Sequence, residues 1–98
     1  MIHATTTVTL DFPFPAVGIN APRKSTVEVP GVTIRDLVEA HILTIDTALK
    51  KYFYSETGEW SPVLSIFVNR KNIRDLQDEN TVLKTGDMVT VLFPYAGG

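Results

Sequence analysis

The last two residues of the sequence, Gly97 and Gly98, have the type and position to take part in chemistry. Glycine lacks a Cβ, so two consecutive glycines can pass through a channel too narrow for any side chain. An α-carboxyl group has a reference pKa of about 3.3 to 3.7, and its ionised form can attack the α-phosphorus of ATP inside another protein's active site. Taking Gly98 as the native end, we interpret the C-terminus as a substrate that the rest of the chain presents. The alternative is a frayed end without function.

The residues just before these glycines form the rest of the predicted tail. Pro94 cannot continue a strand because proline donates no backbone hydrogen bond. Tyr95 either packs on the surface or contacts a partner, since aromatic residues are common interface anchors. Ala96 is small enough to thread a channel together with Gly97. We expect a flexible tail over residues 94–98.

Other chemical sites have little support in the sequence. No paired carboxylates, nucleophile and base, or glycine-rich phosphate loop occur at a suggestive spacing. His3 and His41 have no carboxylate or second histidine at metal-ligand spacing, so no metal site is predicted. Asp36 is better explained as a helix cap, and Trp60 as a loop residue anchored in the core. We assign no catalytic residue, and whether the chain should be called an enzyme stays open.

Length and composition favour one small globular domain over residues 1–98. Nine basic and eleven acidic residues leave a net charge of −2 with both signs scattered, which disfavours binding to nucleic acid or an anionic membrane. The absence of cysteine excludes disulfides and thiolate sites and favours a reducing compartment. The first residues lack the basic and apolar regions of a signal peptide, and no apolar run approaches membrane length, so we expect neither a signal peptide nor a membrane helix. We expect a soluble, cytoplasmic protein.

The apolar pattern predicts strands and helices in a definite order. Alternation predicts a strand from Ile2 to Phe12, and a second strand follows at Ser25–Val29. A helix capped by Thr33 and Asp36 follows, then a break near Leu43–Asp46 and a second short helix. The apolar phase of this second helix comprises Ile45, Ala48, Leu49, Tyr52 and Phe53.

The later elements are strands at 63–68 and 88–93, with a short return strand at 73–76 between them. Val82 and Leu83 are expected to tuck under the sheet. This order predicts an α+β roll, in which a mixed sheet of four to five strands is covered by one main helix and a second short helix. If the first and last strands are parallel neighbours at the centre, the arrangement is a β-grasp.

The predicted faces of the last strands suggest an exposed apolar patch. Leu64, Ile66 and Val68 should point inward, and so should Val89, Val91 and Phe93. The outward set would form a docking surface beside the tail: Phe67, Met88, Leu92 and Val63. The alternative is that loops cover it. Basic residues are a further candidate for partner recognition, either as one patch or as a solvated turn: Arg70, Lys71, Arg74 and Lys84.

The C-terminal third resembles a known family. The matching stretches are Phe67-Val68-Asn69, Ile73-Arg74, Thr81 to Val91, and Pro94-Tyr95-Ala96-Gly97-Gly98. They are similar to the ubiquitin-like sulfur carriers of the MoaD and ThiS type, which have a β-grasp fold. Over the first two thirds the resemblance rests on the order of elements alone.

The resemblance implies a function for the tail. Gly98 would be adenylated by a ubiquitin-activating-like adenylyltransferase of the MoeB or ThiF type and then converted to a thiocarboxylate. Gly97 and Ala96 would thread the partner's site. No cofactor would be bound by the chain, because ATP and a sulfur donor are used by the activating partner. An acceptor enzyme such as the molybdopterin synthase large subunit would take the sulfur.

Several pathways remain open within this resemblance. Our first choice is a small subunit of molybdopterin synthase, in molybdenum or tungsten cofactor biosynthesis. A carrier for thiamine thiazole or cysteine biosynthesis, and a modifier conjugated to lysines, are alternatives. A β-grasp binding module with an incidental tail is a further one. The long proline-rich loop from Phe12 to Arg23 and the extended helical region disfavour a minimal thiazole-pathway carrier.

Overall fold

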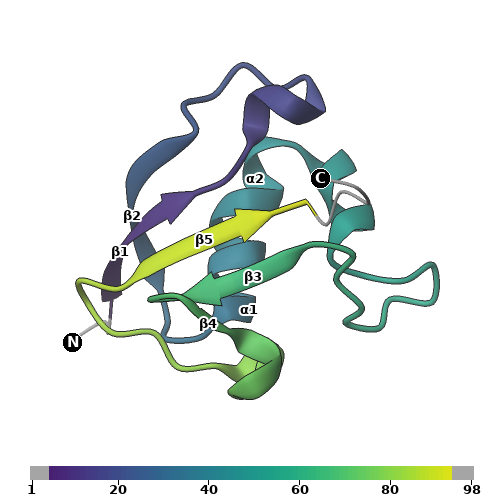
Figure 1. Ribbon diagram of the computed structural model, residues 1–98. Helices are drawn as coiled ribbons and strands as arrows, with labels where there is room; N and C mark the ends of the chain where they lie inside the picture. The colour runs from purple at the N-terminus through teal and green to yellow at the C-terminus, as the bar shows by residue number, and fades with distance from the viewer. Residues whose placement is uncertain (1–4, 94–98) are drawn as a thin grey trace.

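The computed structural model describes residues 5–93, and these residues form one mixed sheet with a helix packed on one face (Figure 1). The sheet has the strand order β2-β1-β5-β3-β4. The strands are β1 (Thr5–Asp11), β2 (Lys24–Pro30), β3 (Ser65–Val68), β4 (Lys71–Asn72) and β5 (Met88–Leu92). The β1 and β5 strands are parallel neighbours, and the other adjacent pairs are antiparallel. The predicted β-grasp arrangement is therefore confirmed.

The main helix begins where the sequence predicts. Thr33 accepts a hydrogen bond from the backbone N–H of Asp36, and the Asp36 carboxylate accepts one from the backbone N–H of Thr33. This capping box satisfies donors that the first helical turn leaves unpaired. Burial of Asp36 acts to raise its pKa, but the hydrogen bonds from Thr33 and Val32 outweigh it and hold the pKa below the usual value.

The helix is continuous but not regular. It runs as α1 (Ile34–Leu37), a π-helical segment (Val38–Ile42) and α2 (Leu43–Ile45). The predicted break falls at Asp46, which is extended and whose side chain accepts a hydrogen bond from Ala48 at 2.8 Å. The second short helix is a 3₁₀ helix (Thr47–Tyr52), whose tighter turn is common in short connecting segments.

Two side chains in this region lie elsewhere than predicted. Ile45 was predicted to be part of the buried phase of the second helix, but it ends α2 and is exposed. The π-helical segment places an additional residue in the preceding turn, so residues after it rotate away from the sheet. Ala48 is also exposed, because the 3₁₀ turn presents only Leu49 and Phe53 fully to the core.

The predicted return strand at 73–76 is wrong. Asn69 and Arg70 both have positive φ, so the chain reverses in two residues and β4 pairs with β3 from Lys71 onward. Residues Ile73–Asp75 form a 3₁₀ helix instead, which the Asn72 side chain caps through the backbone N–H of Arg74. Short tight turns of this kind need positive φ at both central residues.

Buried side chains fill the space between the sheet and the helix. The residues predicted to point inward along the last two strands are buried, apart from the half-buried Phe93: Leu64, Ile66, Val68, Val89 and Val91. Along β1, one face is buried: Thr6, Val8 and Leu10. Phe12, which follows β1, packs on Phe14 and Phe53, with ring centroids 4.5 and 6.2 Å away. Trp60 stacks on Phe53, as expected of a loop anchor. Leu83 is buried as predicted, whereas Val82 is 57% exposed and that part of the prediction is wrong.

Gly31 offers a test of the helix start. It has a φ of +139°, and a Cβ there would lie 2.3 Å from Oδ2 of Asp36. Gly31→Ala should therefore destabilise the fold by about 1 to 2 kcal/mol more than Gly58→Ala, because it also disrupts the capping box. Gly58 is the matched control, since its φ is +86° and its Cβ would meet open space. Equal losses in urea unfolding would show that Asp36 moves aside without cost.

Candidate functional site

The described part of the chain ends at Phe93, one residue after the central strand of the sheet. Phe93, the residue after β5, packs edge-on against Tyr52, with ring centroids 5.5 Å apart. Phe93 is half-buried and packs against the core, which is the inward side that the sequence predicts. Phe93 and Leu92 also line a small hollow together with Pro13, Ala16 and Arg23 of the proline-rich loop. The tail residues lie outside the described part of the chain, so their predicted roles stay predictions: Pro94, Tyr95, Ala96, Gly97 and Gly98.

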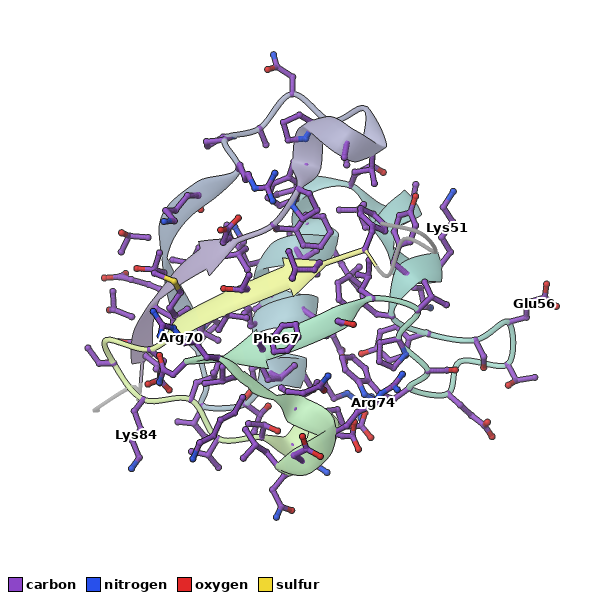
Figure 2. The ribbon with its side chains drawn as sticks, in the orientation of Figure 1. Lys51, Glu56, Phe67, Arg70, Arg74 and Lys84 are labelled. Atoms are coloured by element: carbon purple, nitrogen blue, oxygen red, sulfur yellow. The ribbon has the colours of Figure 1, made fainter. Side chains whose placement is uncertain are left out.

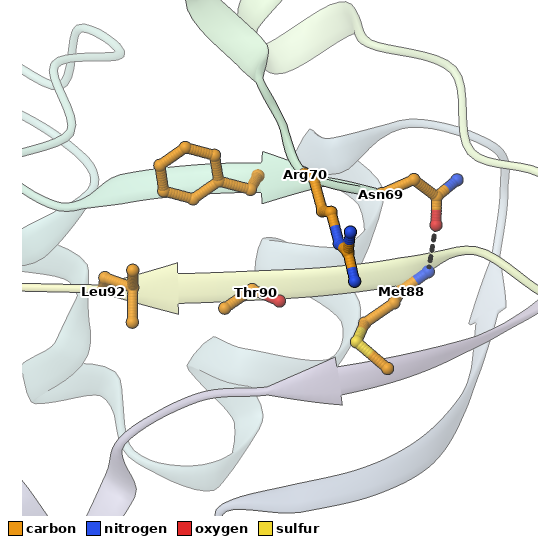
Figure 3. Close-up of a pocket in the computed structure, with 6 residues that line it drawn as sticks. Asn69, Arg70, Met88, Thr90 and Leu92 are labelled. Carbon is orange, nitrogen blue, oxygen red and sulfur yellow. Dashed lines mark hydrogen bonds between the residues drawn. The ribbon is translucent and has the colours of Figure 1, made fainter.

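The outer face of the sheet carries a hollow of about 530 Å³ (Figure 3). We call this surface the sheet-face patch and define it by its lining residues: Phe67, Asn69, Arg70, Met88, Thr90 and Leu92. Met88 and Leu92 are 39% and 41% exposed, and Phe67 is half-buried. The described loops therefore leave the predicted apolar residues open to solvent.

Strand register explains why these side chains meet. Phe67 of β3 lies opposite Thr90 of β5, with Met88 and Leu92 two residues away on either side of Thr90. Side chains alternate between faces along a strand, so these four share the outer face. Val63, which was predicted to join them, is exposed but precedes β3 and does not line the hollow.

The polar end of the sheet-face patch is held by Asn69. Its side-chain oxygen accepts a hydrogen bond from the backbone N–H of Met88 at 2.9 Å, and its amide donates to Asp87 at 2.7 Å. The other Asp87 oxygen accepts from the backbone N–H of Lys84 at 2.8 Å. These bonds fix the turn before β5 to the turn after β3. Asn69 is thus a structural member of the site.

Arg70 is the charged member of the sheet-face patch. Its φ of 75° is in the left-handed region, which costs a non-glycine residue about 1 kcal/mol or more. Its side chain reaches from the β3–β4 turn across β5 toward Met88 (Figure 3). Sequence reasoning placed Arg70 in a polar turn and among the basic residues, and it missed the place of Arg70 in the patch. A reading of Asn69-Arg70 as a two-residue turn would have placed Arg70 at the end of β3, but its reach over β5 depends on tertiary structure.

The four basic residues do not form one patch. Arg74 and Lys84 lie on well-separated parts of the molecule, with Arg70 close to the β3–β4 turn (Figure 2). All three are exposed, as is Lys71. Arg70 alone among them lines the sheet-face patch. For Lys71, Arg74 and Lys84, the interpretation as solvated surface residues therefore fits better than a shared basic patch.

A polar network on the helix side joins α1 and the π-helical segment to the loop that follows the 3₁₀ helix. Arg35 donates to Glu39 at 2.6 Å, and the Tyr54 hydroxyl donates to the same Glu39 oxygen at 2.8 Å. These two hydrogen bonds hold the pKa of Glu39 below its usual value. Burial, together with the bond to Glu39, raises the pKa of Tyr54 to about 12. The network does not line the sheet-face patch, so we assign it to fold stability.

The raised pKa of Tyr54 predicts how the stability of the fold changes at high pH. Because its folded-state pKa lies above the unfolded value of 10, its contribution is complete below pH 10 and is lost as pH rises through about 12. Tyrosinate absorbance should show a step near pH 12 that Tyr54→Phe removes and the control Tyr52→Phe retains. Tyr54→Phe should also lower the unfolding free energy at pH 7 by about 1 kcal/mol. A step near pH 12 that survives in Tyr54→Phe would contradict this assignment.

The described residues contain no metal-binding cluster and no membrane-spanning helix. Burial lowers the pKa of the half-buried His41, and within residues 5–93 no three His, Cys, Asp or Glu side chains gather to hold a metal ion. None of the helices in that range is long and apolar enough to cross a membrane.

Solved structures share this fold. The CysO–BexX complex of Amycolatopsis orientalis contains a chain that matches with a TM-score of 0.72 and 22% identity, over 93% of this chain and 99% of that one. The small archaeal modifier protein 1 of Methanosarcina acetivorans matches with a TM-score of 0.68 and 25% identity over all of both chains. A Pyrococcus furiosus protein described as a candidate molybdopterin converting factor subunit 1 matches with a TM-score of 0.65 and 23% identity, over 92% and 99%.

Sequence comparison gives the family. A curated relative from Archaeoglobus fulgidus, named as a candidate sulfur carrier protein, is 44% identical over 41 residues. That match covers 42% of this chain and spans about half (47%) of the relative's length. The ThiS family matches residues 17–98, which include the end of the proline-rich loop, β2, the helix, β3 to β5 and the two terminal glycines. On this match the chain belongs to the ThiS family of ubiquitin-like sulfur carriers.

Proposed function

We propose that the carboxyl group of Gly98 is adenylated and then converted to a thiocarboxylate, which donates its sulfur to an acceptor enzyme. The observation that supports this most directly is the family match, which extends through Gly97 and Gly98. The fold adds a suitable support, because β5 is held in the sheet between β1 and β3 and leads directly toward these residues. The described residues supply the anchor, and the tail supplies the reacting group.

The proposed chemistry balances without a catalytic residue from this chain. An oxygen of the Gly98 carboxylate attacks the α-phosphorus of ATP, and pyrophosphate leaves. The resulting acyl adenylate has an electrophilic carbonyl carbon. A donor at the oxidation level of hydrogen sulfide then forms the C–S bond, AMP leaves with the C–O bond that breaks, and a proton is released. ATP and the sulfur donor act on the activating enzyme, not on a site in this protein.

The sheet-face patch supports the proposal of a docked partner. Exposed apolar side chains grouped beside a reacting end are a common mark of a protein interface. Phe67 and Leu92 present apolar surface, and Leu92 lies at the end of β5 from which the tail continues. We propose that a ubiquitin-activating-like adenylyltransferase of the MoeB or ThiF type binds here and receives the tail. An acceptor enzyme would use the same carrier after activation.

Within this function we propose sulfur supply to the molybdenum or tungsten cofactor, with this chain as the small subunit of molybdopterin synthase. This choice is supported by two segments that make a minimal thiazole-pathway carrier less suitable, the proline-rich loop and the extended helical region. The proline-rich loop contains a 3₁₀ turn (Phe14–Val17) whose Phe14 is fully buried, and the helical region carries the additional 3₁₀ helix Thr47–Tyr52. Both segments are integrated into the core.

Intact-mass spectrometry of the protein isolated from its native host tests the carrier function and identifies the terminal residue. Replacement of one oxygen by sulfur adds about 16 Da, and this species should disappear after treatment with a thiol-alkylating reagent. Its absence, together with no growth defect when Gly98 is deleted in the host, would refute the proposal.

The pathway is tested by a second experiment, in which the thiocarboxylated protein is mixed with the molybdopterin synthase large subunit and the sulfur-free pterin precursor. Failure to transfer sulfur there would leave thiazole or cysteine biosynthesis as the destination.

A protein modifier is the second candidate function. The structural similarity to the Methanosarcina acetivorans small archaeal modifier protein 1 covers the whole of both chains, and this similarity is the reason to consider a modifier function. In this case the activated Gly98 would be joined to a lysine amine with loss of AMP. A ladder of isopeptide-linked conjugates in the host, abolished by deletion of Gly98, would support the modifier. Thiocarboxylate without conjugates would support the carrier alone.

A further inference from the structure

Arg70 occupies a position that favours glycine. Its φ of 75° follows the φ of 50° at Asn69, and the two residues form the tight turn between β3 and β4. Turns of this kind prefer Asn followed by Gly, because the second central residue also needs positive φ. Asn69 fits this preference, whereas Arg70 does not. A strained residue at such a site calls for a reason other than folding.

The Arg70 guanidinium has no partner within residues 5–93. The ion pairs of arginine in that range involve Arg23 and Arg35, and no hydrogen bond between residues 5–93 reaches the Arg70 side chain. Two acidic groups close to β5 are already engaged. Asp11, which lies beside Thr90 in the β1–β5 register, is paired with Arg23 at 3.0 Å, and Asp87 is held by Asn69. The sheet-face patch therefore presents one uncompensated positive charge beside apolar side chains.

We propose that Arg70 is a specificity-determining residue of the sheet-face patch, which pairs with a carboxylate on the adenylating partner protein while Phe67, Met88 and Leu92 receive an apolar side chain beside it. This inference rests on the proposed function. Guanidinium groups recognise carboxylates through paired hydrogen bonds, and they do so best beside apolar surface that excludes water.

The surroundings of Arg70 favour a protein carboxylate over a polyanion. A nucleic acid or an anionic membrane is held by several basic groups on one face. Here Arg74 and Lys84 lie away from the patch, and the chain carries a net charge of −2 (Figure 2). Among residues 5–93, no acidic side chain lines the hollow to compete for the arginine. A single charge at the edge of an apolar hollow matches one acidic residue next to an apolar one.

The decisive variant is Arg70→Gly, because folding and binding should respond in opposite directions. Glycine relieves the strain at positive φ, so urea unfolding should show equal or greater stability. ATP–pyrophosphate exchange with the purified adenylyltransferase of the same organism should show a KM for the carrier about tenfold higher, with kcat within about twofold. This ratio should shrink as salt is raised from about 0.05 to 0.5 M, because salt screens the charge pair.

Three further variants separate the charge from other effects. Arg70→Asn tolerates positive φ and should raise KM as glycine does, which excludes a gain of turn flexibility as the cause. Arg74→Gln removes an exposed arginine that does not line the patch and should leave KM unchanged. Asp78→Gly relieves a φ of 50° away from the patch and should stabilise the fold without changing KM.

The outcomes distinguish this inference from the proposed function. If the wild-type chain supports no pyrophosphate exchange, the proposed function fails. If the wild type is active and Arg70→Gly has the same KM, the inference about Arg70 fails alone. An equal rise in Arg70→Gly and Arg74→Gln would also overturn it, since the effect would then come from overall charge.

Discussion

Deleting Gly98 is expected to abolish thiocarboxylate formation while the fold stays intact. The shortened tail would present its carboxylate about 3.3 to 3.6 Å short of the α-phosphorus. Because a misplacement of about 1 Å can cost about a hundredfold in rate, activation should fall at least a hundredfold. The buried core of the described residues extends from Val8 to Val91, so urea unfolding should be unchanged within about 0.5 kcal/mol.

Gly98→Ala is the matched variant for this deletion. It keeps the length of the tail and the terminal carboxylate but adds a methyl group at the reacting residue. If the tail threads a channel that excludes side chains, Gly98→Ala should also lose most activation. If only length matters, it should remain active. The readouts are pyrophosphate exchange and the mass gain of about 16 Da, and a deletion variant that still gains this mass would contradict the role of Gly98.

Much of the fold follows from patterns that are local in sequence. Alternation predicted the first strand, and in the structure Thr6, Val8 and Leu10 on one face of β1 are buried. The Thr33 and Asp36 pair predicted the start of the helix, because capping depends on residues three apart. The mixed sheet followed from placing a helix between two pairs of strands, and the structure supplies the condition for a β-grasp, the parallel pairing of β1 and β5. These features need no knowledge of distant contacts beyond the order of elements.

The wrong predictions of secondary structure and burial have physical causes that residue propensities do not reveal. The return strand was misplaced because Arg70 adopts a positive φ, which its residue type disfavours. Ile45 was assigned to the core because a regular period was assumed, whereas the π-helical segment Val38–Ile42 changes the phase. Val82 was assigned beneath the sheet, but its bridge to Thr33 places only Leu83 inward.

The candidate site was predictable in its apolar part and not in its polar part. Strand alternation gave Phe67, Met88 and Leu92 as outward residues, and the structure places all three around one hollow. Val63 was included because the strand was drawn two residues too long at its start. Asn69 and Arg70 reach the hollow only because the turn folds back over β5, which depends on tertiary structure.

The largest effect expected from a residue within the described part of the chain is that of Leu92→Glu. Leu92 is exposed at the end of β5, so a carboxylate there should remain solvated in the free protein and leave its stability nearly unchanged. On docking, the same carboxylate would be removed from water against apolar surface, which costs several kcal/mol when it is unpaired. Adenylation should therefore weaken about a hundredfold, seen mainly as a higher KM.

Phe67→Glu should behave in the same way, because Phe67 lines the other side of the same hollow. Val82→Glu is the matched control, since Val82 is an even more exposed apolar residue that does not line the patch. Each of the three substitutions adds one negative charge, so a difference in activity between the variants cannot come from net charge. If Leu92→Glu and Phe67→Glu fold and are adenylated like Val82→Glu, the sheet-face patch is not the docking surface. If only the first two lose activity, the partner must hold the sheet face while it receives the tail, and binding and chemistry then occur at separate parts of the carrier.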